Sequence, residues 1–474
     1  MVFSSPAFLF FFLPAVYIVY MLLRSRSAQN AWLAAASLLF YAAGQPVYVL
    51  LLLASVAINY SAGRGILAAA DRSEDHPNKA KHILTLAVCG NLALLGYFKY
   101  ADFAVGTLNA LLRTSIPLPG VLLPIGISFY TFQGMSYVID VYRDPSRGTK
   151  NLGKLMLYIS FFPQLIAGPI IKYRDISDQI DERSVTAEGT LLGLRRFITG
   201  FAKKILLADT MGKAADAVFA MTAGRLDARL AWLGAICYTL QIYFDFSGYS
   251  DMAIGLGRLF GFQFAENFDR PYISRSIREF WRRWHISLSS WFRDYLYFPL
   301  GGSRKGETRT HINKFIVFFL TGLWHGANWT FVLWGLWHGL LVTLEDRNII
   351  PKKLTQSLWG HVYAMLGVIL GFVLFRADTL SQAGVMIKAM FTGFSFDPAS
   401  SLALSAILDV RTLVFLAAAL VCAFGLPRKI WEYFCEEGQA VPDTLLYCGY
   451  GALFVLCLLA MAGSTFSPFI YFQF

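Results

Sequence analysis

Charged residues are scarce in this sequence, which excludes an ordinary soluble protein. Only 15% of the 474 residues are Asp, Glu, Lys or Arg, against roughly a quarter in soluble domains. Hydrophobic residues make up 56% and aromatic residues 16%, and the mean hydropathy is +0.51. Long apolar runs, and not short alternating segments, indicate membrane-spanning helices instead of a β-barrel. We therefore predict an all-α, polytopic integral membrane protein.

The sequence also lacks the motifs of several common enzyme classes. It contains no HExxH, P-loop, GxSxG or CxxC motif, so metalloproteases, NTPases and serine hydrolases lose their usual support. The six cysteines lie mostly in apolar runs and predict no structural disulfide. We predict no metal site and no tightly bound cofactor.

Basic residues outnumber acidic ones, which gives a formal charge of +11. They are dispersed between apolar segments, as in cytoplasmic loops that touch anionic lipid, and this pattern argues against nucleic-acid binding. Residues 1–23 carry no charge, and Arg24 and Arg26 follow them. A cleaved signal peptide carries its positive charges before the apolar run. Pro6–Leu23 is therefore predicted to be a first spanning helix with its N-terminus outside the cytoplasm.

The remaining apolar runs bring the total to about eleven predicted transmembrane helices, with re-entrant and interfacial helices between them. Ile83–Phe98 predicts one span, and the shorter run Asp102–Leu112 is predicted either to lie at the membrane surface or to dip into the membrane. The prolines and glycine of Phe161–Ile170 predict a broken helix beside an internal chamber. The basic, aromatic stretch Arg278–Leu300 predicts a single helix in the headgroup layer. Because no linker or repeat marks a boundary, residues 1–474 are predicted to form a single domain.

A central apolar stretch holds the best candidate for chemistry. Phe315–Leu344 contains no charged residue but includes His325 and His338. A titratable side chain is costly in a bilayer and usually faces a cavity or a partner. So long a helix would exceed the hydrocarbon core, and a break is expected at Gly322–Gly326. A neutral imidazole at His325 can take a proton from a hydroxyl that attacks a thioester. The alternative is a histidine hydrogen-bonded within a helix bundle, which is the preferred interpretation for His338.

Five further residues surround these histidine motifs. Trp324 and Asn328 flank His325, and the Asn328 amide could orient the imidazole or donate to an oxyanion. His285 follows Arg282 and Arg283, whose guanidinium groups could receive the phosphates of a nucleotide-like or phosphopantetheine donor. Contact with lipid headgroups is an equally good interpretation of these arginines.

The segment DFSGYSDMAIG contributes four more candidates for a polar path through the protein. Asp245 and Asp251 are carboxylates in an apolar, aromatic setting, and Ser247 and Tyr249 lie between them. The two carboxylates point to different faces of a helix, so they are not expected to form an acid pair. Structural pairing, with an internal arginine as partner, is the better interpretation of both, and the alternatives are capping a helix break or lining a polar path.

Together these motifs resemble the membrane-bound O-acyltransferase family, in particular its bacterial branch of alginate O-acetylation and D-alanyl-teichoic-acid subunits. Residues 129–339 carry the match, and the tail Ser467–Phe474 resembles the polysaccharide-acetylation subfamily. The matching sequences are FYTFQGMSYVIDVYR, FFPQLIAGPI, DFSGYSDMAIG, FWRRWHISLSSWFRDYLYFPLGG and LTGLWHGANWTFVLWGLWHG.

The resemblance implies a ring of membrane helices around a central funnel in the bacterial inner membrane. It implies that His325 of the WHG motif is catalytic and that His285 is the family's upstream histidine. The expected donor is a cytoplasmic thioester such as acetyl-CoA. The acetyl group would reach an exopolysaccharide such as alginate indirectly, through periplasmic partner proteins. Two rivals remain: a transporter of an acylated molecule or polymer, and a scaffold with no chemistry of its own.

Overall fold

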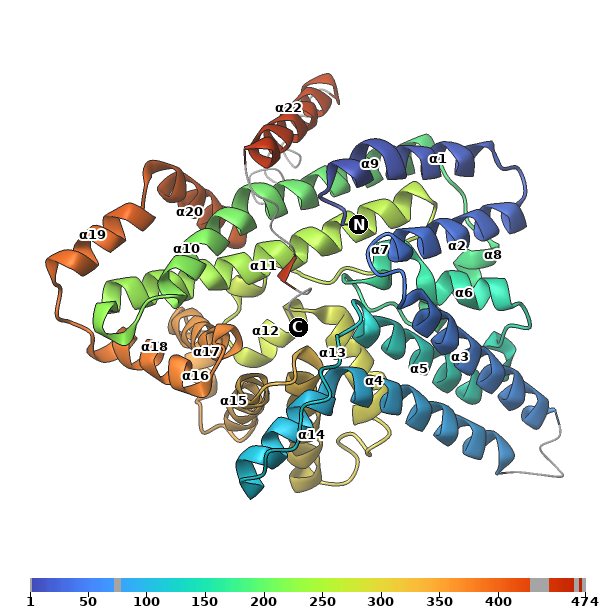
Figure 1. The fold of residues 1–474 in the computed structure, drawn as a ribbon, viewed down its shortest axis with the longest axis horizontal. Coiled ribbons are helices and arrows are strands. Elements are labelled where there is room, and N and C mark those ends of the chain that lie inside the picture. The colour runs from blue at the N-terminus through green and yellow to red at the C-terminus, as the bar shows by residue number, and fades with distance from the viewer. Residues whose placement is uncertain (1, 72–77, 427–442, 464–468, 471–474) are drawn as a thin grey trace. The chain divides into compact units, whose positions relative to one another are not determined.

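The computed structural model describes residues 2–71, 78–426, 443–463 and 469–470. Every regular element in these ranges is a helix, so the all-α prediction is confirmed (Figure 1). The chain forms two compact units. The first comprises Met1–Phe197 with Ser250–Ala265, and the second Ile198–Tyr249 with Glu266–Phe474.

The first unit contains the N-terminal helices. Its α-helices are α1 Leu13–Leu22, α2 Arg26–Ala42, α3 Val49–Ala70, α4 Lys79–Leu112, α5 Ile127–Arg143, α6 Leu152–Ser160, α7 Phe162–Leu165 and α8 Tyr173–Asp181. A π-helical turn, Phe8–Phe12, precedes α1, and a 3₁₀ turn, Pro145–Arg147, follows α5. The helices α3, α4 and α5 pack against one another.

The second unit contains the central motif and the C-terminal helices. Its α-helices are α10 Asp209–Phe219, α12 Ile277–Arg283, α13 Ile286–Phe292, α14 Glu307–His325, α15 Trp329–Asp346, α16 Lys352–Gln356, α17 Trp359–Arg376, α18 Leu380–Thr392, α19 Pro398–Ile407, α20 Val410–Ala423 and α22 Asp443–Ala462. Helices α9, Ala187–Ala202, and α11, Ala228–Leu259, contribute residues to both units. Helix α15 packs between α14 and α17, and all three carry buried aromatic side chains.

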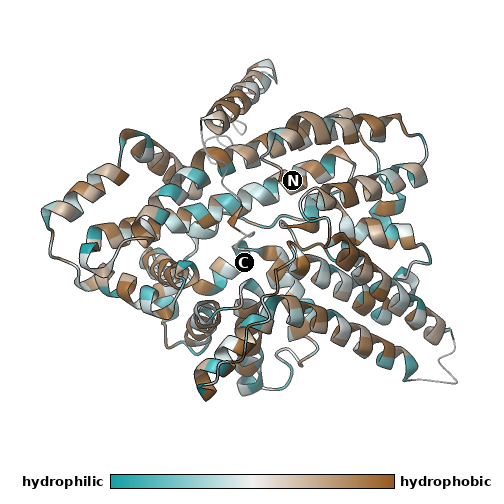
Figure 2. Ribbon diagram, viewed as in Figure 1, coloured by the Kyte–Doolittle hydropathy of each residue, from teal (hydrophilic) through white to brown (hydrophobic). Residues whose placement is uncertain are grey.

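Four described helices are long and apolar enough to span a membrane: α3, α4, α17 and α22. A fifth span arises if α19 and α20, which meet at 68°, form one broken crossing. Figure 2 shows the predominance of hydrophobic residues along α3 and α4. Length and composition thus support a multi-pass membrane protein, and the total of eleven spans stays a prediction.

Two sequence-based boundaries were wrong. The predicted span Ile83–Phe98 and the run Asp102–Leu112, which was separated from it, form the single helix α4, because no proline or glycine lies between them. The predicted interfacial helix Arg278–Leu300 is two helices and a π-helical turn, with a break at His285, whose φ of 44° is left-handed. That break has no local sequence signal.

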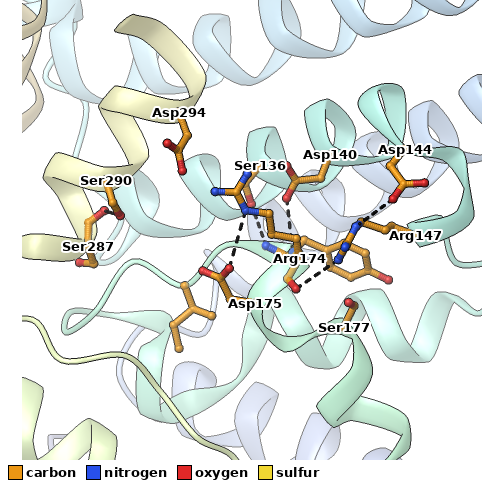
Figure 3. A network of polar contacts seen from close by, with 12 residues as sticks. Ser136, Asp140, Asp144, Arg147, Arg174, Asp175, Ser177, Ser287, Ser290 and Asp294 are labelled. Carbon is orange, nitrogen blue, oxygen red and sulfur yellow. Dashed lines mark hydrogen bonds and ion pairs between the residues drawn. The ribbon is translucent and has the colours of Figure 1, made fainter. Parts of the chain in front are cut away.

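The predicted broken helix after α6 is confirmed. Helix α6 ends at Ser160, and only the single turn α7 follows before an irregular segment leads to α8. Polar contacts tie this segment to the neighbouring helices. The Tyr158 hydroxyl of α6 donates to the Ile171 carbonyl oxygen at 2.8 Å. At the start of α8, the Arg174 backbone N–H donates to Asp140 of α5 at 3.3 Å (Figure 3). These bonds satisfy backbone groups that the broken helix leaves without intrahelical partners.

Candidate functional site

His325 is the last residue of α14, because the backbone beyond it turns away from the helix. Gly326 is extended, with φ −165° and ψ 153°, and the Asn328 side chain begins α15 by accepting the Thr330 N–H at 3.1 Å. The apolar stretch is therefore broken as predicted, at the C-terminal edge of the expected Gly322–Gly326 segment. Asn328 Nδ2 donates to the Asp378 carbonyl oxygen at 2.9 Å. The Asn328 amide thus joins the start of α15 to the segment that follows α17, and its role toward the imidazole stays a prediction.

The two halves of the broken stretch pack at close range. A Cβ atom at Gly322 would overlap the carbonyl oxygen of Phe331, and one at Gly335 would overlap that of Phe318. Glycine is required at both positions because any side chain would push α14 and α15 apart. The close approach fixes the end of α14, and with it His325, against α15.

The His325 imidazole lies in an aromatic environment and is only 3% exposed. The ring centroids of Trp324, Trp334 and Phe375 lie 5.0, 5.1 and 5.1 Å from that of the imidazole, all in edge-to-face geometry. Such an apolar shell strengthens electrostatic interactions within it by excluding water. Trp334 and Phe375 were not among the residues expected here, and nothing in their local sequence distinguishes them from other core aromatics.

His285 is fully buried beside His325. The two ring centroids lie 6.3 Å apart, and Trp324 contacts both rings, with its centroid 5.9 Å from that of His285. His285 Nδ1 lies 3.2 Å from Asn267 Oδ1, whereas Nε2 has no hydrogen-bond partner among the described residues. His285 lies outside the four spanning helices, and burial lowers the pKa of its imidazole to about 3. The ring is therefore neutral at physiological pH.

Buried ion pairs hold the two carboxylates of the DFSGYSDMAIG segment. Lys204 Nζ lies 2.7 Å from Asp245 and 2.9 Å from Asp209, and this ammonium group is almost fully buried. Asp245 also accepts the Ile470 N–H at 2.7 Å. In the first unit, Arg196 donates to Asp251 at 2.7 and 2.8 Å. Lys204 was not among the residues singled out from the sequence, so this cluster is apparent only in the structure.

The remaining candidates lie in different surroundings. Ser247 is buried, and its hydroxyl has no hydrogen-bond partner within the described ranges. The Tyr249 ring packs edge-on against Phe469, one of the two tail residues described. The rest of the predicted tail motif lies outside the described residues.

The two candidate arginines differ in their partners. Arg283 pairs with Asp269 and Glu279, both at 3.0 Å, whereas Arg282 is exposed and makes no ion pair in the described part of the chain. Of these two guanidinium groups, that of Arg282 is the one without an ion pair among the described residues.

The sequence is similar to that of several known proteins. Residues 145–380 match the model of the membrane-bound O-acyltransferase family. The chain is 42% identical to the probable alginate O-acetylase AlgI of Pseudomonas putida, over the full length of both. It is 34% identical to the peptidoglycan O-acetyltransferase of Helicobacter pylori, over 82% of this chain and 80% of that protein. The teichoic acid D-alanyltransferase of Bacillus subtilis is 31% identical over 51% of this chain and 65% of that protein.

The chain belongs to the membrane-bound O-acyltransferase family. As a member of this family it is an acyltransferase, which decides against the transporter and scaffold interpretations. The family match spans both histidines, Asn267 and the aromatic shell of His325. The two histidines that the sequence motifs singled out are thus brought together in the second unit, whereas Asp251 belongs to the first.

Two residues that hold His285, Asn267 and Ser287, were not among the candidates predicted from the sequence. Ser287 Oγ donates to Asn267 Oδ1 at 2.8 Å, and the Ser287 backbone N–H donates to the same oxygen at 3.2 Å. In this acyltransferase Asn267 lies in an irregular segment beside charged residues, where an asparagine is unremarkable. Only the three-dimensional structure reveals that it is 1% exposed and packed against a candidate catalytic histidine.

Proposed function

We propose that this acyltransferase moves an acetyl group from a cytoplasmic thioester, such as acetyl-CoA, across the bacterial inner membrane for the O-acetylation of an exopolysaccharide. The observation that carries the proposal is the pairing of two buried histidines, with ring centroids 6.3 Å apart, in a chain 42% identical to an alginate O-acetylase along its whole length. Alginate is the proposed polymer, and periplasmic partner proteins are the proposed intermediaries.

His325 is the proposed general base. A hydroxyl oxygen of the acceptor attacks the carbonyl carbon of the thioester as the imidazole takes the hydroxyl proton. The tetrahedral intermediate then breaks its carbon–sulfur bond, and the proton returns to the leaving thiolate. The aromatic shell of Trp324, Trp334 and Phe375 supports this role, because it keeps water from competing with the acceptor.

His285 is the proposed second histidine of the site, on the side of the donor. Exposed Arg282 is a candidate for the phosphates of the donor, and the better-paired Arg283 is a weaker one. Asn328, Asp245, Ser247, Tyr249 and Asp251 remain proposed contributors to the path of the acyl group. The N-terminus is proposed to be periplasmic, because Arg24 and Arg26 follow the first apolar helix.

The direct test is complementation of a Pseudomonas putida strain that lacks its own alginate O-acetylase. We expect the wild-type chain to restore acetyl esters on secreted alginate and His325→Ala to lower them at least about 100-fold, the usual contribution of a general base. The matched control is His82→Ala, which removes an exposed histidine at the start of α4. Wild-type acetylation by His325→Ala would overturn the role of His325, and failure of the wild-type chain would overturn alginate as the polymer.

The donor is tested separately in proteoliposomes. Radiolabelled acetyl-CoA is supplied on one face of the membrane, and transfer of label to periplasmic extract on the other face is measured. We expect label to cross from only one face and to require His325. Equal labelling from both faces would contradict a directional, cytoplasmic donor.

A further inference from the structure

The backbone around His285 is shaped by a segment distant in sequence. The Asp269 N–H donates to the Arg283 carbonyl oxygen at 2.9 Å, and the Ile286 N–H donates to the Asn267 carbonyl oxygen at 2.9 Å. These bonds replace the helical ones that residues 283–286 would otherwise make, and His285 adopts its left-handed conformation between them. Residues 267–269 therefore position the histidine through the main chain.

The Asn267 side chain then determines which ring nitrogen of His285 carries a proton. The backbone N–H of Ser287 can only donate, so the Asn267 atom 3.2 Å from it is the carbonyl oxygen Oδ1. Ser287 Oγ donates to the same oxygen. His285 Nδ1 also lies 3.2 Å from Oδ1, and an oxygen that only accepts requires a proton on that nitrogen. A neutral imidazole with its proton on Nδ1 keeps a lone pair on Nε2.

Among the residues that the structure describes, that lone pair is buried without a partner. His285 is 0% exposed, and Nε2 makes no hydrogen bond within the described ranges. Three apolar rings pack around the His285 imidazole: Phe246, Phe268 and Trp324. The fourth neighbouring ring is the imidazole of His325, which can carry a proton. A buried acceptor left unpaired is costly unless another group satisfies it, and a substrate can do so.

We propose that Asn267, assisted by Ser287, is a positioning residue of the acyl transfer: it fixes His285 as the Nδ1–H tautomer and keeps Nε2 available to accept a hydrogen bond from the bound substrate. This inference rests on the proposed function of the site. It assigns a role to a residue outside both histidine motifs. Asn267 acts through His285 and is not itself a catalytic residue.

The test measures the tautomer directly. The protein contains seven histidines, so their ¹⁵N signals must be distinguished. Solid-state NMR spectra of the full chain in bilayers are recorded with ¹⁵N-labelled histidine for the wild type and for His285→Gln. The difference between the two spectra isolates the His285 signals. We expect a protonated Nδ1 and an unprotonated Nε2 in the wild type. Asn267→Leu should lose this preference, and Asn267→Asp should keep Nδ1 protonated, because a carboxylate accepts the same hydrogen bonds. A wild-type His285 protonated on Nε2 would overturn the proposal without touching the proposed acyl transfer.

Initial rates complete the test. They are measured as acetyl esters formed from radiolabelled acetyl-CoA by membranes of the complemented strain. We expect Asn267→Leu to lower the rate at least about tenfold, Asn267→Asp to recover most of it, and Ser287→Ala to have a smaller effect because the bond from Nδ1 survives. The matched control is Asn313→Asp, another buried asparagine of the second unit, which donates to the Gly302 carbonyl oxygen and should leave the His285 tautomer unchanged.

The combination of readouts separates the possible failures. A changed tautomer with a wild-type rate would overturn the positioning role. A lost rate with an unchanged tautomer would also overturn it, since the defect would then be one of folding. If wild-type membranes form no ester while His285 carries its proton on Nδ1 in an Asn267-dependent way, the proposed function fails and not the control of the tautomer.

Discussion

The imidazole rings of His285 and His325 lie 6.3 Å apart and meet at 61°, although one precedes α13 and the other ends α14. Neither helix carries both residues. Their approach depends on two departures from regular helix, one at each histidine. Each departure is held by an asparagine: Asn267 beside His285, and Asn328 at the start of α15.

Acidification should destabilise the protein through His285. The folded-state pKa of this imidazole is about 3, below the usual 6.5, so the unfolded chain binds the proton more readily. Stability contributed by the neutral ring is present above pH 6.5 and is lost as the pH falls below it. Between pH 7 and 5.5 we expect a loss of about 1 kcal/mol from this group, measured by thermal unfolding in detergent. His285→Gln should show a shallower decline, and an equally steep decline would contradict this assignment.

Gly322→Ala should destabilise the contact between α14 and α15. The new methyl group would overlap the Phe331 carbonyl oxygen, and backbone cannot move aside as a flexible side chain can. We expect a cost of about 1–3 kcal/mol and a lower melting temperature. The matched control is Gly384→Ala in α18, where no atom lies within 4 Å of the added Cβ, and where a gain of about 0.5–1 kcal/mol is expected. Equal effects of the two changes would argue against the close packing.

Lys204→Met should be strongly destabilising. It would leave the carboxylates of Asp245 and Asp209 buried without the ammonium group that lies within 3 Å of both. Removing one partner of a buried ion pair typically costs about 3–5 kcal/mol. Lys213→Met, at an exposed position of α10, should change stability by less than about 0.5 kcal/mol. Similar melting curves for the two variants would show that the cluster contributes little.

Glu345→Gln should weaken the start of α12. This carboxylate is 2% exposed and accepts the Ile277 N–H at 2.6 Å, the Arg278 N–H at 3.1 Å and the Tyr363 hydroxyl at 3.1 Å. Loss of the charge should cost about 1.5–3 kcal/mol, the range for hydrogen bonds to charged groups. Hydrogen exchange at the first turn of α12 should rise more than exchange in α10. Unchanged protection of that turn would contradict the capping role.

The sequence alone predicted the class of the fold and the position of its principal break. Scarce charge and long apolar runs require helices in a membrane, because a bilayer offers no partners for backbone groups. Gly322 and Gly326 predicted the interruption near His325, which the structure locates at Gly326–Asn328. The motifs around His285 and His325 predicted the family.

Only the tertiary structure decided how the two histidines are held. The break at His285 lacks glycine and proline, and it exists because Asn267 and Asp269 take over hydrogen bonds that a continuous helix would have made. Lys204 likewise resembles any basic residue of an amphipathic helix until Asp245 is seen beside it. A local sequence pattern indicates which backbone conformations have a low free energy for that segment alone. A conformation stabilised by residues distant in the chain becomes visible only when those residues have been brought into contact.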